Sequence, residues 1–250
     1  MLPCDMAKVI VIPARLASDR FPDKLLQAQT GWPLIRHVYD RCTQVGGVHR
    51  VVVAVDGPRL AQAVGEFGGE VILTDAQLPT GTDRVAAAVA SLHLDGPSDL
   101  VVNVQGDEPE LEPAHVERLF ELLQEADSPV AVATLATRRS DGEGFANPNR
   151  VKVVVDELHN ALYFSRAPIP SAGSDTSWLY HVGVYGFRPG ALERFAARKP
   201  GFLERRERLE QLRFLEMGLG IRVAIVAEAA PGIDTPEDYQ RFVDRLGRKK

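Results

Sequence analysis

Short apolar runs alternate with amphipathic segments through the first half of the chain. The apolar runs predict strands, and the segments between them, with apolar residues at helical spacing, predict helices. Strands that are apolar on both faces must be covered on both sides, so the alternation predicts a parallel sheet between layers of helices. The expected strands are Lys8–Ile12, Arg50–Asp56, Glu70–Thr74 and Leu100–Gln105, and the expected helices are Pro33–Val45, Pro58–Phe67 and Asp83–Leu94.

The pattern changes after a further helix expected at Pro113–Ala126. Strand-like segments then follow one another with little helix between them, which predicts an antiparallel excursion within one domain spanning residues 8–248. The polar segment Pro170–Trp178 is expected to be a mobile loop. The expected strands are Val130–Ala136, Val151–Asp156, Ala161–Ser165, His181–Phe187 and Arg222–Ala227, and the helices are Ala191–Arg198, Glu204–Met217 and Pro236–Leu246.

Composition narrows the class of protein. With 45% hydrophobic and 25% charged residues in 250, the chain is typical of a soluble globular protein. Its net charge of -5 argues against a general nucleic-acid coat. Cys4 and Cys42 are too few for a disulfide framework and lack metal-ligand spacing. Neither an export signal nor an apolar run of about 20 residues is evident, which favours the cytoplasm.

A basic loop follows the first expected strand. The β-branched run Val9–Ile12 meets Pro13, and Arg15, Arg20 and Lys24 follow it closely. Ligands of α/β proteins bind at the carboxyl ends of such strands, so these cations suggest a polyanion such as a triphosphate. A solvated basic loop is the alternative. Neither GxxxxGK[ST] nor GxGxxG is present, so any nucleotide must be held differently.

Two acidic positions are candidates for a metal site. Asp107 follows the strand that ends at Gln105, where a carboxylate facing a triphosphate is well placed to hold Mg²⁺. Asp234 precedes Thr235, which has the pattern of a helix N-cap, with Asp238 at the capping-box position. Capping does not account for Asp234, which is therefore a candidate second metal ligand. A turn whose acidic residues are merely exposed is the alternative for Asp107.

Further polar positions carry weaker signals. The segment Thr80–Arg84 opens a helix whose first amides could approach a base or phosphate, although an ordinary helix start explains it as well. Arg166 could bind a substrate carboxylate or pair with a structural acid. His181 lies on an apolar strand, where a satisfied structural histidine is the commoner case. Glu210 and Gln211 lie within the sequence LEQLR.

Taken in order, these segments resemble the 3-deoxy-manno-octulosonate cytidylyltransferases, or CMP-Kdo synthetases. The resemblance runs over nearly the whole chain and implies a nucleotide-diphospho-sugar transferase (Rossmann-like) fold. It implies a homodimer that couples CTP to the sugar acid Kdo with Mg²⁺, releasing pyrophosphate, for lipopolysaccharide biosynthesis. The matching segments are IPARLASDRFPDKLL, GTDR, NVQGDEPE, NPNRVKVV, ALYFSRAPIP, HVGVYGF, LEQLR and GIDTPEDY.

The resemblance also implies residue roles. It places a strand-rich region, residues 149–187, at the dimer contact. The catalytic residues would be Arg15, Lys24 and Asp107, and the metal ligands Asp107 and Asp234. The nucleotide would contact Pro13, Ala14, Arg15, Lys24, Thr80, Gly81, Thr82, Arg84 and Gln105. Kdo would contact Gln105, Arg166, His181, Glu210 and Gln211.

Three departures from the family pattern keep alternatives open. Asp23 stands where glycine is usual, which adds a negative charge beside the expected triphosphate. Thr80 replaces a serine, and the Pro170–Trp178 loop is short. The acceptor could therefore be a related acid sugar, such as 8-amino Kdo or a nonulosonate. A catalytically inactive nucleotide-binding module is the alternative from another class.

Overall fold

A computed structural model of the chain describes residues 6–18, 20–94, 96, 98–125, 130–171 and 177–248. In these residues one nine-stranded sheet runs through the molecule. Its first part is parallel, in the order β3-β2-β1-β4. These strands are β1 (Lys8–Ala14), β2 (Arg50–Val55), β3 (Glu70–Leu73) and β4 (Leu100–Asn103).

The second part of the sheet contains the antiparallel strands. β8 (Trp178–Phe187) pairs antiparallel with β4 and with β5 (Val132–Arg139), and β5 pairs parallel with β9 (Ile221–Val226). The hairpin of β6 (Lys152–Val155) and β7 (Ala161–Ser165) joins β8 through β6. The expected mostly parallel sheet with an antiparallel excursion is therefore confirmed.

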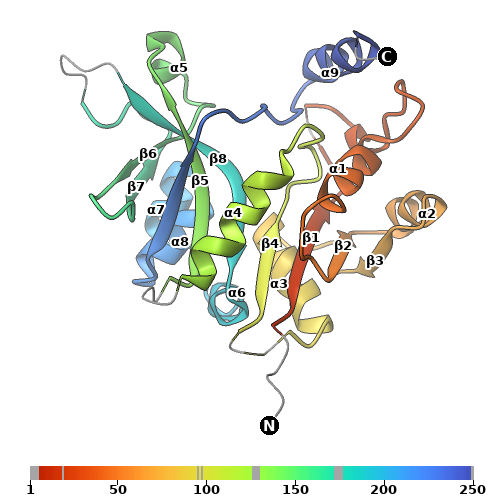
Figure 1. Cartoon of the computed structure of the whole chain (residues 1–250), viewed down its shortest axis with the longest axis horizontal. Coiled ribbons are helices and arrows are strands. Elements are labelled where there is room, and N and C mark those ends of the chain that lie inside the picture. The colour runs from red at the N-terminus through yellow and green to blue at the C-terminus, as the bar shows by residue number, and fades with distance from the viewer. Residues whose placement is uncertain are drawn as a thin grey trace.

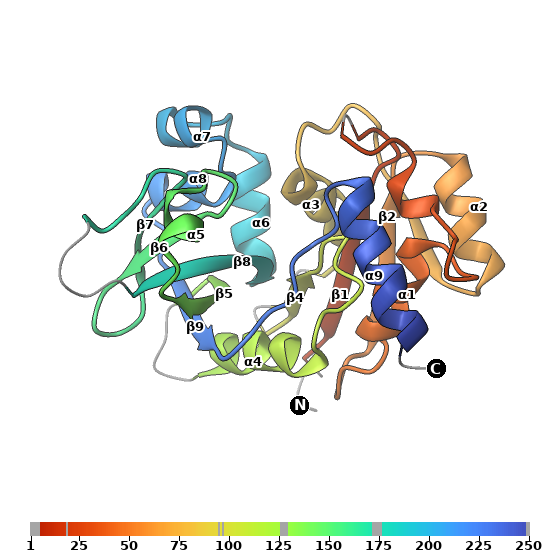
Figure 2. The same cartoon turned by 90° about the horizontal axis from the view of Figure 1, so that it is seen from above.

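Helices cover both faces of the sheet, each with its own buried apolar cluster. In Figure 1, α4 lies in front of the sheet and α6 behind it, and Figure 2 shows the same layers from above. The first face carries α1 (Leu34–Cys42), α2 (Pro58–Glu66), α4 (Pro113–Gln124) and α9 (Pro236–Arg248). The second carries α3 (Gly81–Ser91), α6 (Pro189–Ala196) and α8 (Gln211–Glu216).

The order of the parallel strands fixes where a ligand can bind. From β1 the chain moves outward to β2 and β3, then returns to the other side of β1 as β4. The loops after β1 and β4 therefore diverge at the carboxyl edge of the sheet, which is the usual ligand position in such folds. After β9, the chain crosses this edge and reaches α9 on the other half of the molecule (Figure 2).

Several local features differ from the predictions. β1 continues through Pro13 to Ala14, where it still pairs with β2. The ladder with β4 ends opposite Val11, so on that side there is no strand partner for the amide that Pro13 lacks. The helix expected over residues 204–217 is divided into α7 (Phe202–Glu207) and α8 by Arg208, whose φ is 55°. Pro33 is the N-cap of α1 rather than a first-turn residue. The short helix α5 (Gly142–Ala146) was not predicted.

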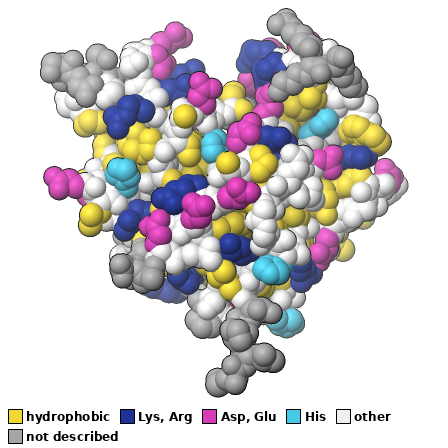
Figure 3. All heavy atoms as spheres, viewed as in Figure 1, with side chains coloured by type: hydrophobic (Ala, Val, Ile, Leu, Met, Phe, Trp, Pro, Cys, Tyr) yellow, Lys and Arg dark blue, Asp and Glu magenta, His cyan; other side chains and the backbone are white. Residues whose placement is uncertain are grey.

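Of the expected loop Pro170–Trp178, residues 172–176 lie outside the described residues. Cys42 is buried in α1, as expected from its helical pattern. On the face drawn in Figure 3, positive and negative side chains are interspersed, without one large basic patch. Among the described helices, none is long and apolar enough to cross a membrane.

Candidate functional site

A cavity of about 550 Å³ lies at the carboxyl edge of β1 and β4. Four segments and two single residues supply its walls. These are the end of β1 with the loop after it (Pro13, Ala14, Arg15, Ala17, Ser18 and Arg20), η1 (Lys24 and Leu25), the start of α3 with the turn before it (Leu78, Pro79, Thr80, Gly81 and Arg84), the loop after β4 (Gln105, Gly106 and Asp107), Glu210 and Asp234. Every nucleotide-contact residue expected from the resemblance lines this cavity except Thr82.

Lys24 is the cation at the centre of the site. The 3₁₀ turn η1 (Lys24–Leu26) holds its side chain half-buried. Its Nζ donates to Asp107 Oδ2 at 2.6 Å and to the carbonyl oxygen of Ile233 at 2.7 Å. Arg15 is exposed and makes no hydrogen bond or ion pair with another described residue, so its guanidinium is available to an anion.

The two candidate metal ligands converge, although they are far apart in the sequence. Asp234 Oδ1 lies 3.9 Å from the same Lys24 Nζ that contacts Asp107, and 2.9 Å from Arg20 Nη2. A backbone hydrogen bond of 2.8 Å from Ile233 N to the Asp107 carbonyl joins the two segments. The crossing segment after β9 is thus tied to the loop after β4.

The donor set fits a magnesium ion that is shared with phosphates. Among the described residues, no group of three or more His, Cys, Asp or Glu side chains could hold a metal by itself. Mg²⁺ is usually held by one or two carboxylates together with substrate phosphates and water. Asp107 and Asp234, which face a common cation, provide this number of ligands.

The expected capping box at the start of α9 is confirmed. Thr235 N donates to Asp238 Oδ2 at 2.9 Å, and Asp238 N donates to Thr235 Oγ1 at 3.2 Å. Asp234 N also donates to Asp238, at 3.1 Å, which fixes the backbone before the cap. The Asp234 carboxylate has no part in these bonds and is directed to the basic loop.

The turn before α3 presents small side chains to the cavity. Thr80 is the N-cap of α3, and its hydroxyl accepts from Asp83 N at 3.0 Å. A side chain at Gly81 would meet Gln105 Oε1 at 3.7 Å and Pro13 Cγ at 3.8 Å, so glycine keeps this part of the cavity open. Thr82 N donates to Glu210 Oε2 at 3.1 Å.

Arg84, on the first turn of α3, is buried although it lines the cavity. It donates to the Thr74 hydroxyl and to the carbonyl oxygen of Asp75, the latter at 3.3 Å. Burial lowers the pKa of Arg84, and the positive charge of Arg15 lowers it further. The negative charges of Asp56 and Asp75 act in the opposite direction. These contacts give Arg84 a fixed place beside the nucleotide-facing loops.

The expected Kdo ligands divide into two groups. Gln105 and Glu210 line the cavity, whereas Arg166, His181 and Gln211 are not among the described residues of its walls. The Arg166 side chain donates to three backbone carbonyls, those of Glu207 at 2.9 Å, Pro148 at 3.1 Å and Arg208 at 3.3 Å. The Arg166 side chain therefore connects the end of β7 with Glu207 and Arg208 at the end of α7.

His181 and Gln211 are buried. His181 Nε2 lies 3.0 Å from Thr134 Oγ1, and its ring packs against Phe164. Burial lowers the pKa of His181 to about 3, so the imidazole is neutral. In this structure His181 has the environment of a satisfied core histidine.

Two further residues have strongly shifted pKa values that the sequence analysis did not indicate, although both lie in quoted motifs; neither is among the described residues that line the cavity. Glu108, in NVQGDEPE, is half-buried beside Asp107, and burial together with the Asp107 charge raises its pKa to about 8. Tyr185, in HVGVYGF, is buried, and burial raises its pKa, with Glu210 and Glu108 adding to the shift. Burial is a tertiary property, so the motifs alone did not distinguish these two residues.

Asp23 is directed away from the cavity. Its backbone is left-handed, with a φ of 52°, a conformation in which glycine is favoured. Its carboxylate pairs with Arg59 of α2 at 3.3 Å. Asp23 is not among the described residues that line the cavity, so its charge is offset outside the site.

Comparisons with known proteins agree with this geometry. The family model described as Cytidylyltransferase matches residues 9–223. A 3-deoxy-manno-octulosonate cytidylyltransferase of Syntrophobacter fumaroxidans is 47% identical over 97% of this chain and 98% of its own. An 8-amino-3,8-dideoxy-manno-octulosonate cytidylyltransferase of Shewanella pealeana is 43% identical over 96% of this chain and 99% of its own.

A solved structure shows the same likeness in three dimensions. It is a CMP:2-keto-3-deoxy-manno-octonic acid synthetase complexed with CTP. It has a TM-score of 0.91 and 40% sequence identity, and the match covers 98% of this chain and 100% of that chain. This chain belongs to the cytidylyltransferase family.

Proposed function

We propose that this protein transfers CMP from CTP to the anomeric hydroxyl of Kdo, giving CMP-Kdo and pyrophosphate. The observation that carries the proposal is the convergence of Asp107 and Asp234 on Lys24, in a cavity that Arg15 also lines. This arrangement suits a nucleoside triphosphate and its metal ion. The relatives named for this reaction cover nearly the whole chain.

The chemistry requires positioning and charge neutralisation. The anomeric hydroxyl oxygen attacks the α-phosphorus in line and loses its proton to solvent, while the bond from that phosphorus to the α–β bridging oxygen breaks and pyrophosphate leaves. Arg15 and Lys24 would hold the departing phosphates and offset their charge. The turn Thr80–Thr82 would bind the cytosine, and Gln105 and Glu210 would contact the acceptor. Asp107 and Asp234 would hold a magnesium ion, which when bound supplies positive charge near the α-phosphate.

Kdo is the favoured acceptor, and its 8-amino derivative is the second candidate. The relatives include proteins named for each sugar acid, at similar identity. A nonulosonate is a more distant alternative. An inactive nucleotide-binding module is disfavoured, because Asp23, the only feature that suggested it, pairs with Arg59 rather than facing the triphosphate side.

We also propose that residues 8–248 form one nucleotidyltransferase domain that works as a homodimer through residues 149–187. The continuous sheet supports the single domain. Leu158 and Leu162, on the β6–β7 hairpin, are 69% and 61% exposed, and apolar side chains on such a hairpin suit a contact with a second copy. A cytoplasmic location is favoured because CTP is supplied there and because Cys42 is a free thiol, which is usual in a reducing compartment.

A panel of acceptors and nucleotides tests the proposal. Kdo, 8-amino Kdo and a nonulosonate are each incubated with CTP, UTP, ATP or GTP and Mg²⁺, and pyrophosphate release is measured. We expect the highest kcat/KM with Kdo and CTP. A higher value with 8-amino Kdo would reassign the acceptor, whereas tight CTP binding without turnover on any acceptor would favour the inactive module.

A further inference from the structure

We propose that Arg213 is a positioning residue, which holds the nucleotide-binding turn Thr80–Thr82 through Asp83. This inference rests on the proposed function, because it assigns a role to the far side of that turn. Neither Arg213 nor Asp83 lines the nucleotide cavity among the described residues, so both would act through Thr80 rather than touch the substrate.

Arg213 is rigidly held. Its side chain is 2% exposed, and it pairs with both carboxylate oxygens of Glu204, at 2.7 and 2.6 Å. Its Nη1 also donates to the carbonyl oxygens of Phe195 and Arg198, at 3.3 and 3.1 Å, and its guanidinium stacks 3.6 Å from the Phe195 ring centre. A guanidinium with this many contacts has a fixed position, so it can fix the position of a carboxylate that pairs with it.

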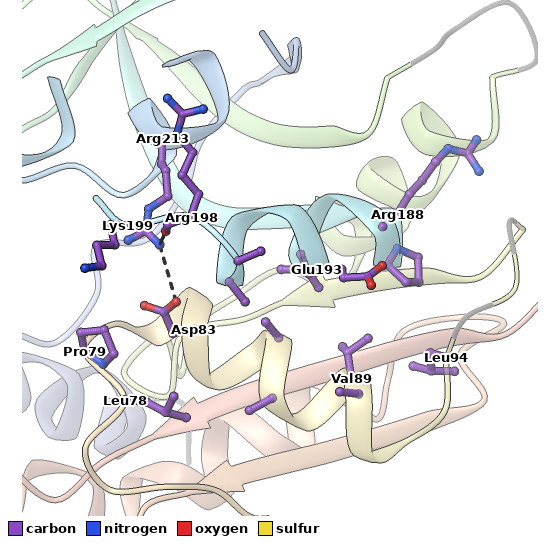
Figure 4. Close-up of a pocket in the computed structure, with 18 of the residues that line it drawn as sticks. Leu78, Pro79, Asp83, Val89, Leu94, Arg188, Glu193, Arg198, Lys199 and Arg213 are labelled. Carbon is purple, nitrogen blue, oxygen red and sulfur yellow. Dashed lines mark hydrogen bonds and ion pairs between the residues drawn. The ribbon is translucent and has the colours of Figure 1, made fainter. Parts of the chain in front are cut away.

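The connection from Arg213 to the turn passes through one carboxylate. Asp83 Oδ1 lies 3.6 Å from Arg213 Nη1, the contact drawn as a dashed line in Figure 4. The other oxygen, Asp83 Oδ2, accepts from the Thr80 hydroxyl at 2.7 Å. The chain of contacts is therefore Glu204, Arg213, Asp83 and Thr80, and it ends at the N-cap of α3.

The turn needs this support because a second hollow lies behind it. A groove of about 1150 Å³ runs between α3 and α6, and Asp83 and Arg213 both line it (Figure 4). Leu78 and Pro79 line both this groove and the nucleotide cavity, so the wall between the two spaces is thin. The ion pair of Asp83 with Arg213 lies behind this wall and supports the turn from that side.

A second contact ties the same turn to α8. Glu210, the residue before α8, accepts from Thr82 N at 3.1 Å. The helix that carries Arg213 therefore fixes the turn at two points, Thr80 and Thr82. Movement of α8 should consequently alter the affinity for the nucleotide.

The test is the substitution Asp83→Asn. It keeps an oxygen for the Thr80 hydroxyl but removes the charge that attracts Arg213. We expect the calorimetric dissociation constant of CTP and the KM for CTP to rise about fivefold, with kcat changed by less than about twofold. Arg213→Lys, which keeps the positive charge but cannot make both bonds to Glu204, should give a similar rise.

Glu216→Gln is the matched control on α8. Glu216 accepts from Leu203 N and Glu204 N, at 3.0 and 3.4 Å. Glutamine keeps one acceptor oxygen there, so the change removes a charge on α8 without a contact to the turn and without displacing Glu204. It should lower the melting temperature but leave the CTP affinity unchanged. An unchanged affinity in both Asp83→Asn and Arg213→Lys, or an equal loss in Glu216→Gln, would overturn the inference. Absence of wild-type turnover would instead count against the proposed function, and the calorimetric comparison would still decide this inference.

Discussion

The two halves of the sheet supply different kinds of binding surface. On the parallel half, charged groups such as Arg15 and Lys24 stand at the open ends of β1 and β4. On the antiparallel half, His181 and Gln211 are buried, and the Arg166 side chain is engaged with backbone carbonyls. Among the described residues, the Arg15 guanidinium is thus available to an anion, whereas Lys24 on the nucleotide side and Arg166 and His181 on the acceptor side have partners within the protein.

This difference has an energetic consequence. A group that already has protein partners must exchange them for substrate contacts, and the net gain is smaller than for a free group. We therefore expect substitutions on the parallel half to act on turnover and CTP. Those on the antiparallel half should act on the sugar acid and on stability. The four changes that follow test this division.

Asp107→Asn should have the largest effect. It removes the carboxylate shared by Lys24 and the expected metal ion, so kcat should fall by at least about a hundredfold. Pyrophosphate release measures the rate, and circular dichroism should show an unchanged fold. Glu110→Gln in the same loop is the control, because Glu110 pairs with Arg245 on α9 and should leave the rate unaltered. Near-normal turnover of Asp107→Asn would rule out the catalytic role.

His181→Gln should change how stability depends on pH. Burial holds the pKa of His181 at about 3, against 6.5 in an unfolded chain. Between these values the unfolded state binds more protons, so the free energy of unfolding falls as the pH falls, by about 1.4 kcal/mol per pH unit from this group. Glutamine does not titrate and can retain the bond to Thr134.

Urea unfolding from pH 6.5 to 4 measures this dependence. The wild type should lose stability more steeply than His181→Gln, because every other titrating group is common to both proteins. Parallel slopes would show that His181 is exposed to solvent protons in the folded state. The variant also tests the acceptor role, since a Kdo contact would raise the KM for Kdo independently of pH.

Arg166→Lys should raise the KM for the sugar acid about tenfold and leave the affinity for CTP unchanged. Lysine cannot reproduce the three directed bonds to the carbonyls of Glu207, Pro148 and Arg208. Steady-state kinetics with each substrate varied in turn measures the two constants. An equal rise in both KM values would show that Arg166 affects CTP binding as much as sugar-acid binding, so that the two halves of the sheet do not act separately.

The smallest effect is expected at Asp23 and Arg59. Arg59→Ala leaves the Asp23 carboxylate unpaired near the phosphate-facing loop, so the KM for CTP should rise about two- to threefold at low salt and less at high salt. Asp23→Gly suits the left-handed backbone and should abolish the effect of Arg59→Ala. Additive changes in the double variant would show that the two residues act independently.

The sequence predicted the type and order of most elements, since their apolar periodicity is local. It missed the break at Arg208, because a left-handed residue within a helical pattern has no composition signal. It indicated Asp107 and Asp234 as a pair of candidates but not their common contact with Lys24. The supports behind Thr80, namely Asp83 and Arg213, had no signal beyond their motifs.

The sequence by itself determined the alternation of strands and helices, the basic loop after β1 and the acidic residues after β4. These features depend on neighbours within a few positions, whose side chains share one face or one turn. Only the tertiary structure decided which charges meet and which polar groups are buried. Those properties arise where the segment after β9 and the start of α8 contact the parallel half. Contacts between such distant segments depend on the whole fold rather than on any local pattern.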